Sequence, residues 1–164
     1  MVLSIKDVID VIKKDPECVI SAPSGLPMID DVLQLPDDVR YFYENCGGIV
    51  LHPDSNYSFA IVGPKEFVRA NPVIVGEVCS EDISSMWYIV CRDRNNNFLT
   101  IDLSKKRNGK CYDSFWDRHG IVGECAVIAN NFTELVYQLY RHRGECLFWL
   151  EEQFTYLGDA YDEF

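Results

Sequence analysis

Positive charge is scarce in this sequence of 164 residues. It contains 15 Lys and Arg residues against 26 Asp and Glu residues, which gives a formal net charge of −11. Nucleic acids carry the same sign of charge, so a protein without a broad basic face is repelled by them. We therefore expect no nucleic-acid partner. The same charge balance favours association with a basic protein.

The sequence also lacks the segments that direct a chain to or through a membrane. Its first residues show no basic region followed by an apolar run and a small-residue cleavage site. No apolar run approaches the roughly 20 residues that a helix needs to span a bilayer. We expect a soluble, cytoplasmic protein with no membrane partner.

Cysteine is plentiful, but the patterns that would use it are missing. The seven cysteines are odd in number, no two form a CxxC pair, and three histidines offer few further ligands. These spacings fit neither a disulfide framework nor a tetrahedral zinc site. We expect reduced, mostly buried thiols, no bound metal and no cofactor.

Catalytic motifs are missing as well. The chain contains no phosphate-binding glycine loop, no triad and no cluster of metal ligands at motif spacing. His119 lies close in sequence to Asp113 and Asp117, but no nucleophile or oxyanion site accompanies these groups. We therefore expect that the protein is not an enzyme. A hydrolase that uses Cys or His chemistry is kept as a third hypothesis, after the two binding functions described below.

The sequence does contain enough apolar material for a full core. Hydrophobic residues make up 48% of the chain, and its length fits one domain. The most informative stretch is residues 86–103, where two strand-forming runs flank the polar loop 93–97 and predict a β-hairpin. Both faces of the first run are apolar, so we expect a central strand with Trp87 in the core.

Helix signals occur at both ends of the chain. Ser4 and Asp7 form a capping-box pattern at the start, and Asn131 with Glu134 forms a variant of it near the end. Further helices are predicted to begin at Leu26, at Asp37 and at Glu145.

The order of these elements predicts the fold class. Helices come first, then strands joined by short turns, then helices. This order predicts a single α+β domain over residues 1–164, with a twisted, mostly antiparallel or mixed sheet of about six strands and flanking N- and C-terminal helices. Residues 145–164 are expected to form a C-terminal helix and an acidic tail.

Four blocks of sequence follow one another in a characteristic order. They read LPDDVRYFY with NCGG (residues 35–48), WYIV (87–90), FLTIDL (98–103) and NNFTEL (130–135). In this order and spacing they resemble the SUKH superfamily, and specifically its Smi/Knr-type family, over roughly residues 26–140.

The resemblance implies both a fold and a function. The fold is α+β with a mixed sheet of about six strands. Many bacterial members are immunity proteins that bind and neutralise a cognate polymorphic toxin, often a nuclease, whereas fungal members are regulatory scaffolds. We therefore expect a non-enzymatic immunity-type protein with a basic toxin domain as its partner. A regulatory or scaffold interaction protein of the same fold is the alternative.

Candidate partner-binding residues follow from charge and position, because the binding surface varies within the family. A loop can present contact residues on a rigid scaffold, and an exposed tryptophan is a frequent interface anchor. The competing interpretation is that the acidic residues form an ordinary solvated surface. The candidates are Glu77, Glu81 and Asp82 before the hairpin, Trp116 in a loop, and Glu151, Glu152, Asp159 and Asp162, which continue to Glu163, near the C-terminus.

Overall fold

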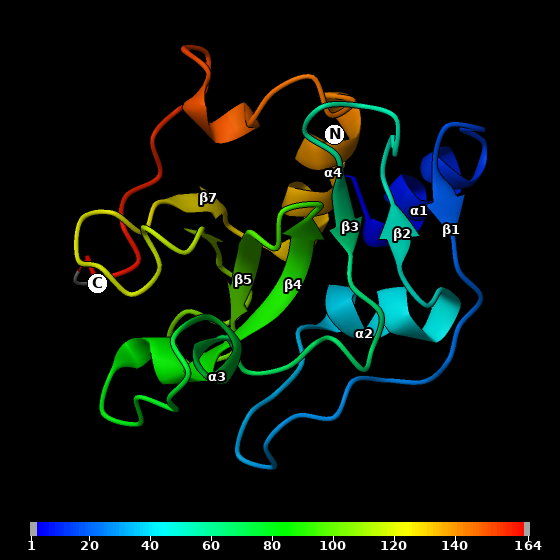
Figure 1. Ribbon diagram of the computed structural model, residues 1–164. Coiled ribbons are helices and arrows are strands. Elements are labelled where there is room, and N and C mark those ends of the chain that lie inside the picture. Colours follow the sequence, from blue (N-terminus) through cyan, green and yellow to red (C-terminus); the bar gives the residue numbers. More distant parts are fainter. Residues whose placement is uncertain (1–2, 163–164) are drawn as a thin grey trace.

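The computed structural model describes residues 3–162 of the chain, so Glu163 of the predicted acidic run lies outside the described residues (Figure 1). Its strands form one seven-stranded sheet in which each strand pairs antiparallel with its sequence neighbours. The predicted α+β fold is confirmed, with one strand more than expected and antiparallel pairing throughout the described sheet. The strands are β1 (Val19–Ile20), β2 (Ile49–Val50), β3 (Phe59–Ile61), β4 (Trp87–Asp93), β5 (Phe98–Asp102), β6 (Cys111–Ser114) and β7 (Val127–Ala129).

Three of the α-helices pack together on one face of this sheet, and a short fourth lies beside β4 (Figure 1). The three-helix layer consists of α1 (Ile5–Lys13), α2 (Asp37–Asn45) and α4 (Phe132–Arg141), and the short helix is α3 (Ala70–Ile74). The 3₁₀ turns η1 (Ile83–Met86) and η2 (Phe148–Leu150) complete the described elements.

Both predicted capping motifs are present. The Ser4 hydroxyl accepts a hydrogen bond from the Asp7 backbone N–H at 3.1 Å, and the Asp7 carboxylate accepts one from the Ser4 N–H at 3.1 Å. At α4 the Asn131 side chain accepts from the Glu134 N–H at 2.8 Å. Such caps satisfy backbone donors that the first helical turn leaves without partners.

The main core fills the space between the helical layer and the sheet. Its largest side chains include Phe42, Tyr43 and Phe132, which are fully buried. Their rings meet edge to face, with centroids 4.9 Å apart for Phe42 and Tyr43 and 5.1 Å apart for Phe42 and Phe132. Burying one side chain of this size contributes roughly 1.5–3 kcal/mol, so this layer supplies much of the stability.

The predicted hairpin is formed by β4 and β5. The Asp93 carboxylate accepts hydrogen bonds from the N–H groups of Asn95 and Asn97, each at 2.8 Å, and Asn96 adopts the left-handed conformation with φ of 59°. Trp87 to Cys91 are all buried, which confirms that both faces of β4 are covered.

A second core covers the other face of the sheet near β6 and β7. It consists of Trp87, Tyr112, Cys125, Val127 and Ala160. The Trp87 and Tyr112 rings lie 4.5 Å apart between centroids. The C-terminal chain closes this core, because the Ala160 N–H donates to the Cys125 carbonyl at 2.8 Å and the Val127 N–H donates to the Gly158 carbonyl at 2.9 Å. The tail is therefore packed beside β7 through residue 162.

Two predicted helices are wrong. Residues 26–34 follow an irregular path in place of a helix, and the Asp30 carboxylate accepts hydrogen bonds from the Val32 N–H at 3.1 Å and from Arg69 at 3.0 Å in a local turn. The predicted C-terminal helix from Glu145 is reduced to the single turn η2. Phe148 and Trp149 bury their side chains in the main core at that turn, and the chain then runs extended toward β7. Tertiary burial thus overrides the local helical pattern.

No helix among residues 3–162 is long and apolar enough to cross a membrane.

Candidate partner-binding surface

Three segments that are distant in sequence lie around the second core. They are the loop 75–82 after α3, the loop 115–124 after β6, and the C-terminal segment 157–162, which we call together the loop surface. Figure 1 shows them at the left and lower left, away from the three-helix layer. The three segments contain six of the eight residues predicted as partner contacts, namely Glu77, Glu81, Asp82, Trp116, Asp159 and Asp162.

Asn71 of α3 joins the first two segments. It is 2% exposed, and its amide nitrogen donates to the Val78 carbonyl at 3.2 Å and to the Ser84 hydroxyl at 3.0 Å. Its amide oxygen lies 2.6 Å from His119 Nε2, so the Nε2–H of a neutral His119 is the donor. One buried side chain therefore fixes both loops relative to η1.

His119 itself is structural. It is 6% exposed, and its ring packs edge-on against Trp87 at 5.6 Å between centroids. Burial lowers the pKa of His119 to about 4, since the charged form is poorly solvated there, although the nearby Asp82 carboxylate opposes this shift. The imidazole is neutral at pH 7 and acts as a hydrogen-bond donor to Asn71.

Asp82 connects the first loop to the C-terminal segment. Its Oδ2 atom accepts hydrogen bonds from the Ser84 N–H at 2.9 Å, from the Ser84 hydroxyl and from the Tyr161 hydroxyl at 2.7 Å. Burial alone would raise the pKa of Asp82, but these hydrogen bonds outweigh it and hold the pKa below its usual range. Asp82 is therefore engaged within the protein, whereas its neighbours Glu77 and Glu81 are exposed.

Asp159 has a different place from the one predicted. It is only 4% exposed, so the expectation of a surface contact is corrected. Its Oδ2 atom accepts from the Gly123 N–H at 3.1 Å and from the Tyr161 N–H at 3.0 Å, and its own N–H donates to the Asp162 carboxylate at 2.8 Å. These bonds turn the chain and attach the C-terminal segment to the loop 115–124.

Trp116 is 77% exposed on a loop whose base is fixed. On one side the buried Asp113 carboxylate accepts from Arg118 Nε at 2.8 Å and from Trp149 Nε1 at 3.0 Å. The Arg118 guanidinium also lies over the Phe115 ring, 4.8 Å from its centroid. Burial raises the pKa of Asp113, although the backbone N–H of Phe115 and the charge of Arg118 oppose this. The loop therefore presents Trp116 to solvent without large conformational freedom.

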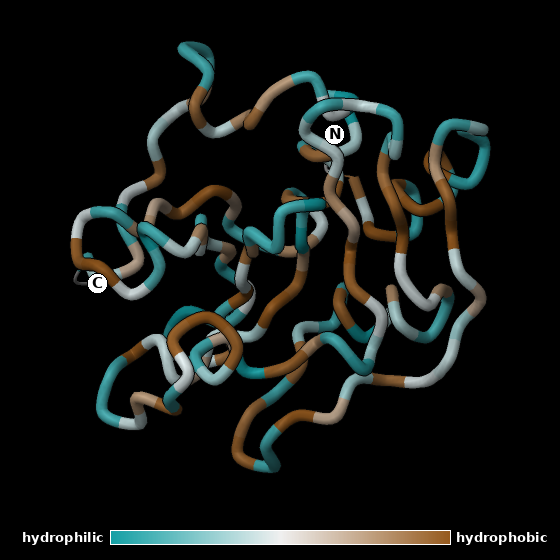
Figure 2. The backbone as a smooth tube through the Cα atoms, viewed as in Figure 1, coloured by the Kyte–Doolittle hydropathy of each residue, from teal (hydrophilic) through white to brown (hydrophobic). Residues whose placement is uncertain are grey.

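Sequence analysis missed four exposed apolar side chains on the same surface. Val75 and Val78 are each 52% exposed, Ile121 is 47% exposed and Val122 is 73% exposed. Figure 2 shows apolar positions on α3 and on the loop between β6 and β7. A sequence signal existed for two of them, because Ile121 and Val122 are adjacent apolar residues between two glycines in a turn-rich loop. Together with Trp116 they supply the apolar centre that protein interfaces use.

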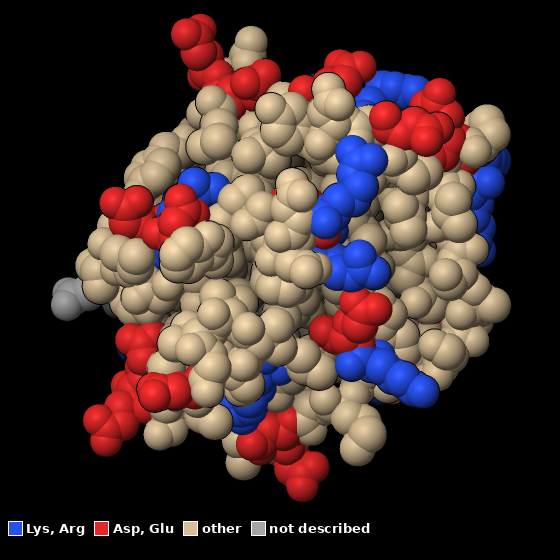
Figure 3. All heavy atoms as spheres, viewed as in Figure 1, with Lys and Arg blue, Asp and Glu red and all other residues tan. Residues whose placement is uncertain are grey.

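The charge on the loop surface is nearly all acidic. Glu77, Glu81, Asp117 and Glu124 are exposed, and Arg118 is the only basic residue within the three segments. In Figure 3 acidic side chains lie over the loop after α3 and over the loop after β6, with uncharged atoms between them. An apolar centre with an acidic rim fits a basic protein partner.

Glu151 and Glu152 lie elsewhere. They are exposed on the turn after η2, at the top of Figure 1, so the structure does not bring them to the loop surface. Glu151 borders a groove of about 520 Å³ between α4 and the C-terminal chain. This groove is a second possible contact region, distinct from the loop surface.

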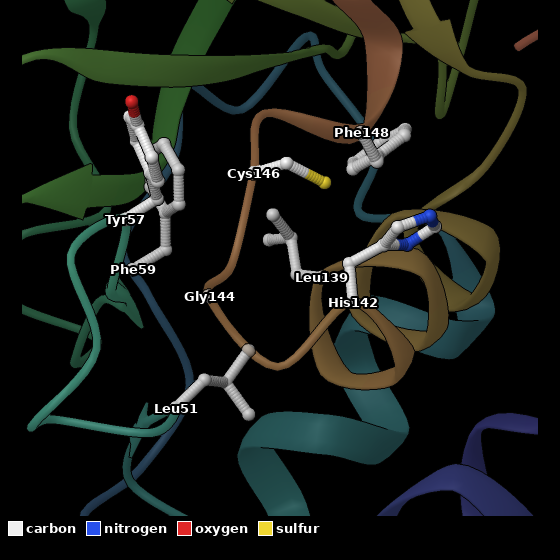
Figure 4. A pocket seen from close by; sticks show the side chains of 8 residues that line it. All are labelled: Leu51, Tyr57, Phe59, Leu139, His142, Gly144, Cys146 and Phe148. Atoms are coloured by element: carbon white, nitrogen blue, oxygen red, sulfur yellow. The ribbon is translucent and has the colours of Figure 1, made fainter. Parts of the chain in front are cut away.

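A small cavity lies under the chain that leaves α4. It measures about 10 Å³, enough for about one water molecule. Figure 4 shows the residues that line it, including His142, Gly144 and Cys146. His142 Nδ1 faces the Gln138 carbonyl at 2.9 Å, and burial raises the pKa of the Cys146 thiol, so the thiol is protonated at neutral pH. This cavity has no room for a substrate.

The structure does not bring Cys111 and His119 together as a catalytic pair. Cys111 is fully buried in the main core, and burial raises its pKa well above the usual value for a thiol. His119 lies beside the second core, with its donor nitrogen used by Asn71. The two side chains therefore do not share a site.

One group of potential metal ligands is found among residues 3–162, namely Asp15, Cys18 and His52. It lies outside the loop surface.

The chain matches the model of the SMI1 / KNR4 family (SUKH-1) over residues 33–138. The chain therefore belongs to this family, as the four sequence blocks predicted. It is also 52% identical to immunity protein YokJ of Bacillus subtilis (strain 168) over 160 residues, which is 98% of this chain and 97% of that protein. No solved structure shows a significant match to the chain.

Proposed function

We propose that the chain is an immunity protein, which binds a toxin protein and blocks its action without catalysis. The observation that carries this proposal is the 52% identity to immunity protein YokJ over nearly the full length of both chains. The region compared covers 98% of this chain. The buried positions of Cys111 and His119 support a binding role over a catalytic one.

The loop surface is the proposed contact site. Its three segments are held by hydrogen bonds of Asn71, Asp82 and Asp159, so little conformational entropy is lost when a partner binds. Trp116 supplies the aromatic anchor, and Glu77 and Glu81 supply charge at the rim. The anchor depends on apolar contact area and the rim depends on charge, so separate variants can test the two roles.

The acidic charge favours a basic toxin domain as the partner. A nuclease domain needs a positive face to bind its own substrate. An acidic protein that covers such a face competes with the nucleic acid for the same Lys and Arg side chains of the toxin. The proposed inhibition is therefore occlusion of the basic face of the toxin, helped by electrostatic steering during encounter.

The test is binding kinetics with the cognate toxin domain at two ionic strengths. Trp116→Ala should raise the dissociation rate by about tenfold or more, as expected for a central aromatic anchor. The double variant Glu77→Gln/Glu81→Gln should slow association and flatten its salt dependence, because rim charges act mainly on the encounter.

The matched control is the double variant Glu151→Gln/Glu152→Gln, which removes the same charge at the turn after η2. It should bind with nearly wild-type kinetics. All variants are checked for folding by circular dichroism. If the control pair slows association and the Glu77/Glu81 pair does not, the contact lies at the groove along α4. If the wild-type chain does not bind the toxin, the immunity function itself is refuted.

A further inference from the structure

Asp15, Cys18 and His52 converge at the edge of the sheet opposite to the loop surface. Asp15 follows α1, Cys18 precedes β1 and His52 follows β2. The antiparallel pairing of β1 with β2 brings them together, since Val19 pairs with Val50 and Ile20 pairs with Ile49. The carboxylate oxygen, the thiol sulfur and the imidazole nitrogen all lie within 4.8 Å of one another.

The Cys18–His52 contact is a long hydrogen bond to sulfur, and both His52 separations are also close to those between ligands of one metal ion. His52 Nε2 lies 3.8 Å from Cys18 Sγ and 3.6 Å from Asp15 Oδ2. The nitrogen–oxygen distance is too long for a hydrogen bond. Ligand atoms around a tetrahedral zinc ion, with bonds of about 2.0–2.3 Å, lie roughly 3.4–3.6 Å apart. The two His52 separations therefore lie within a few tenths of an ångström of those around a bound ion, and the Asp15–Cys18 separation is at most 4.8 Å, so the two side chains would have to move closer together by up to about 1.2 Å.

His52 is buried like His119, and it differs from His119 in its strained backbone and in the two further ligand atoms near its Nε2 atom. It is 4% exposed, its Nδ1 atom has no hydrogen-bond partner, and its backbone has a positive φ of 46°. Buried polar groups and left-handed residues other than glycine both cost free energy, and such features concentrate at functional sites. The ring stacks on Tyr140 at 5.5 Å between centroids, which directs Nε2 toward the other two ligands.

The other two donors are suited to a divalent cation. The Asp15 carboxylate accepts from the Glu17 N–H at 2.9 Å and from the Tyr140 hydroxyl at 3.0 Å, and these bonds orient it as outer partners orient metal ligands. A Cys18 thiolate and the Asp15 carboxylate together balance a charge of +2. The Arg143 guanidinium lies 4.0 Å from Asp15, but it is half exposed and is paired with Glu17, so it can move away.

We propose that Asp15, Cys18 and His52 bind a zinc ion, with a water molecule in the fourth position. Sulfur and imidazole donors favour zinc over magnesium or calcium. On binding, Cys18 loses its thiol proton to solvent and becomes the ligating thiolate. The ion would connect α1, the edge strand β1 and the loop after β2. This proposal departs from the sequence expectation of no bound metal.

The test uses the full chain without a histidine tag, freed of metal by a chelator and kept reduced with a phosphine. Zinc is titrated by calorimetry, and cobalt is titrated while the thiolate-to-cobalt charge-transfer band is recorded in the near ultraviolet. We expect one ion per chain, with at least tenfold weaker binding in Cys18→Ser and His52→Asn. Asparagine is chosen at residue 52 because it tolerates a positive φ. The matched control Cys79→Ser changes another partly exposed thiol and should bind as the wild type does.

Wild-type protein that binds no stoichiometric zinc would overturn the proposal. So would a charge-transfer band that persists in Cys18→Ser or that disappears in Cys79→Ser. If Cys18→Ser does not fold, Asp15→Asn takes its place, because the amide keeps the shape of the carboxylate but not its charge. Zinc should also raise the melting temperature of the wild type and leave that of Asp15→Asn nearly unchanged.

Discussion

Acid should loosen the loop surface through one histidine. His119 donates to Asn71 as a neutral imidazole, and burial lowers its pKa to about 4 from an ordinary value of 6.5. Between these two pKa values the unfolded chain binds a proton that the folded chain excludes. Stability from this group is therefore fully present above pH 6.5 and is lost as the pH falls toward 4.

The size of the effect follows from the shift. One pKa unit corresponds to about 1.36 kcal/mol of differential interaction. With a pKa of about 4 in the folded state, His119 should lower the free energy of unfolding by roughly 2 kcal/mol as the pH falls from 7 to 4.5. Other groups titrate in this range as well, since the pKa of Asp113 is raised, but they are common to the variants compared.

The assay is urea unfolding at pH 7, 6, 5 and 4.5 for the wild type, His119→Gln and His142→Gln. His119→Gln cannot titrate, so its stability should fall by roughly 2 kcal/mol less than that of the wild type. The control His142→Gln should follow the wild type. NMR of the imidazole should show His119 neutral at pH 5. Equal losses in the wild type and His119→Gln, or a ring that is charged at pH 6, would refute this account.

Two further predictions concern stability at neutral pH. In Gly144→Ala the new Cβ would lie 1.9 Å from Ser55 Oγ at a positive φ of 68°, so we expect a loss of roughly 2–4 kcal/mol in urea unfolding. Gly123→Ala is its control, because that φ is also positive at 84° but nothing lies within 4 Å, and it should cost only about 1 kcal/mol; equal losses would refute the steric argument. Ser4→Ala removes the hydroxyl that accepts from the Asp7 N–H and should lower stability by about 0.5–2 kcal/mol, whereas an unchanged urea midpoint would contradict the cap.

Much of the fold could be predicted because its signals are local. The hairpin depends on two strand-forming runs and on Asp93 and the asparagines between them, all within eighteen residues of sequence (86–103). The caps of α1 and α4 depend on side chains that bond to the backbone three residues away. These hydrogen bonds join residues only two to four positions apart. They form whenever the local helix or turn forms, so the sequence alone indicates them.

The C-terminal part could not be predicted in the same way. A helical pattern from Glu145 was visible, yet burial of Phe148 and Trp149 and the pairing of residues 158–160 with β7 determine the path of the chain. Asp159 looks like a tail charge in the sequence, but its carboxylate is a buried acceptor for Gly123. These contacts join segments separated by more than thirty residues (Gly123 to Asp159), and local propensity carries no information about them.

The sequence by itself determined the fold class, the family and the acidic character of the chain. Only the tertiary structure decided which of the acidic and aromatic residues share a surface, because Asn71 and Tyr161 connect loops that no local pattern relates. It likewise decided that Asp15, Cys18 and His52 meet, since the register of β1 against β2 sets the distance between them. In both places the chain is brought together by pairing across the sheet and by buried hydrogen bonds, and these form only when the whole core is packed.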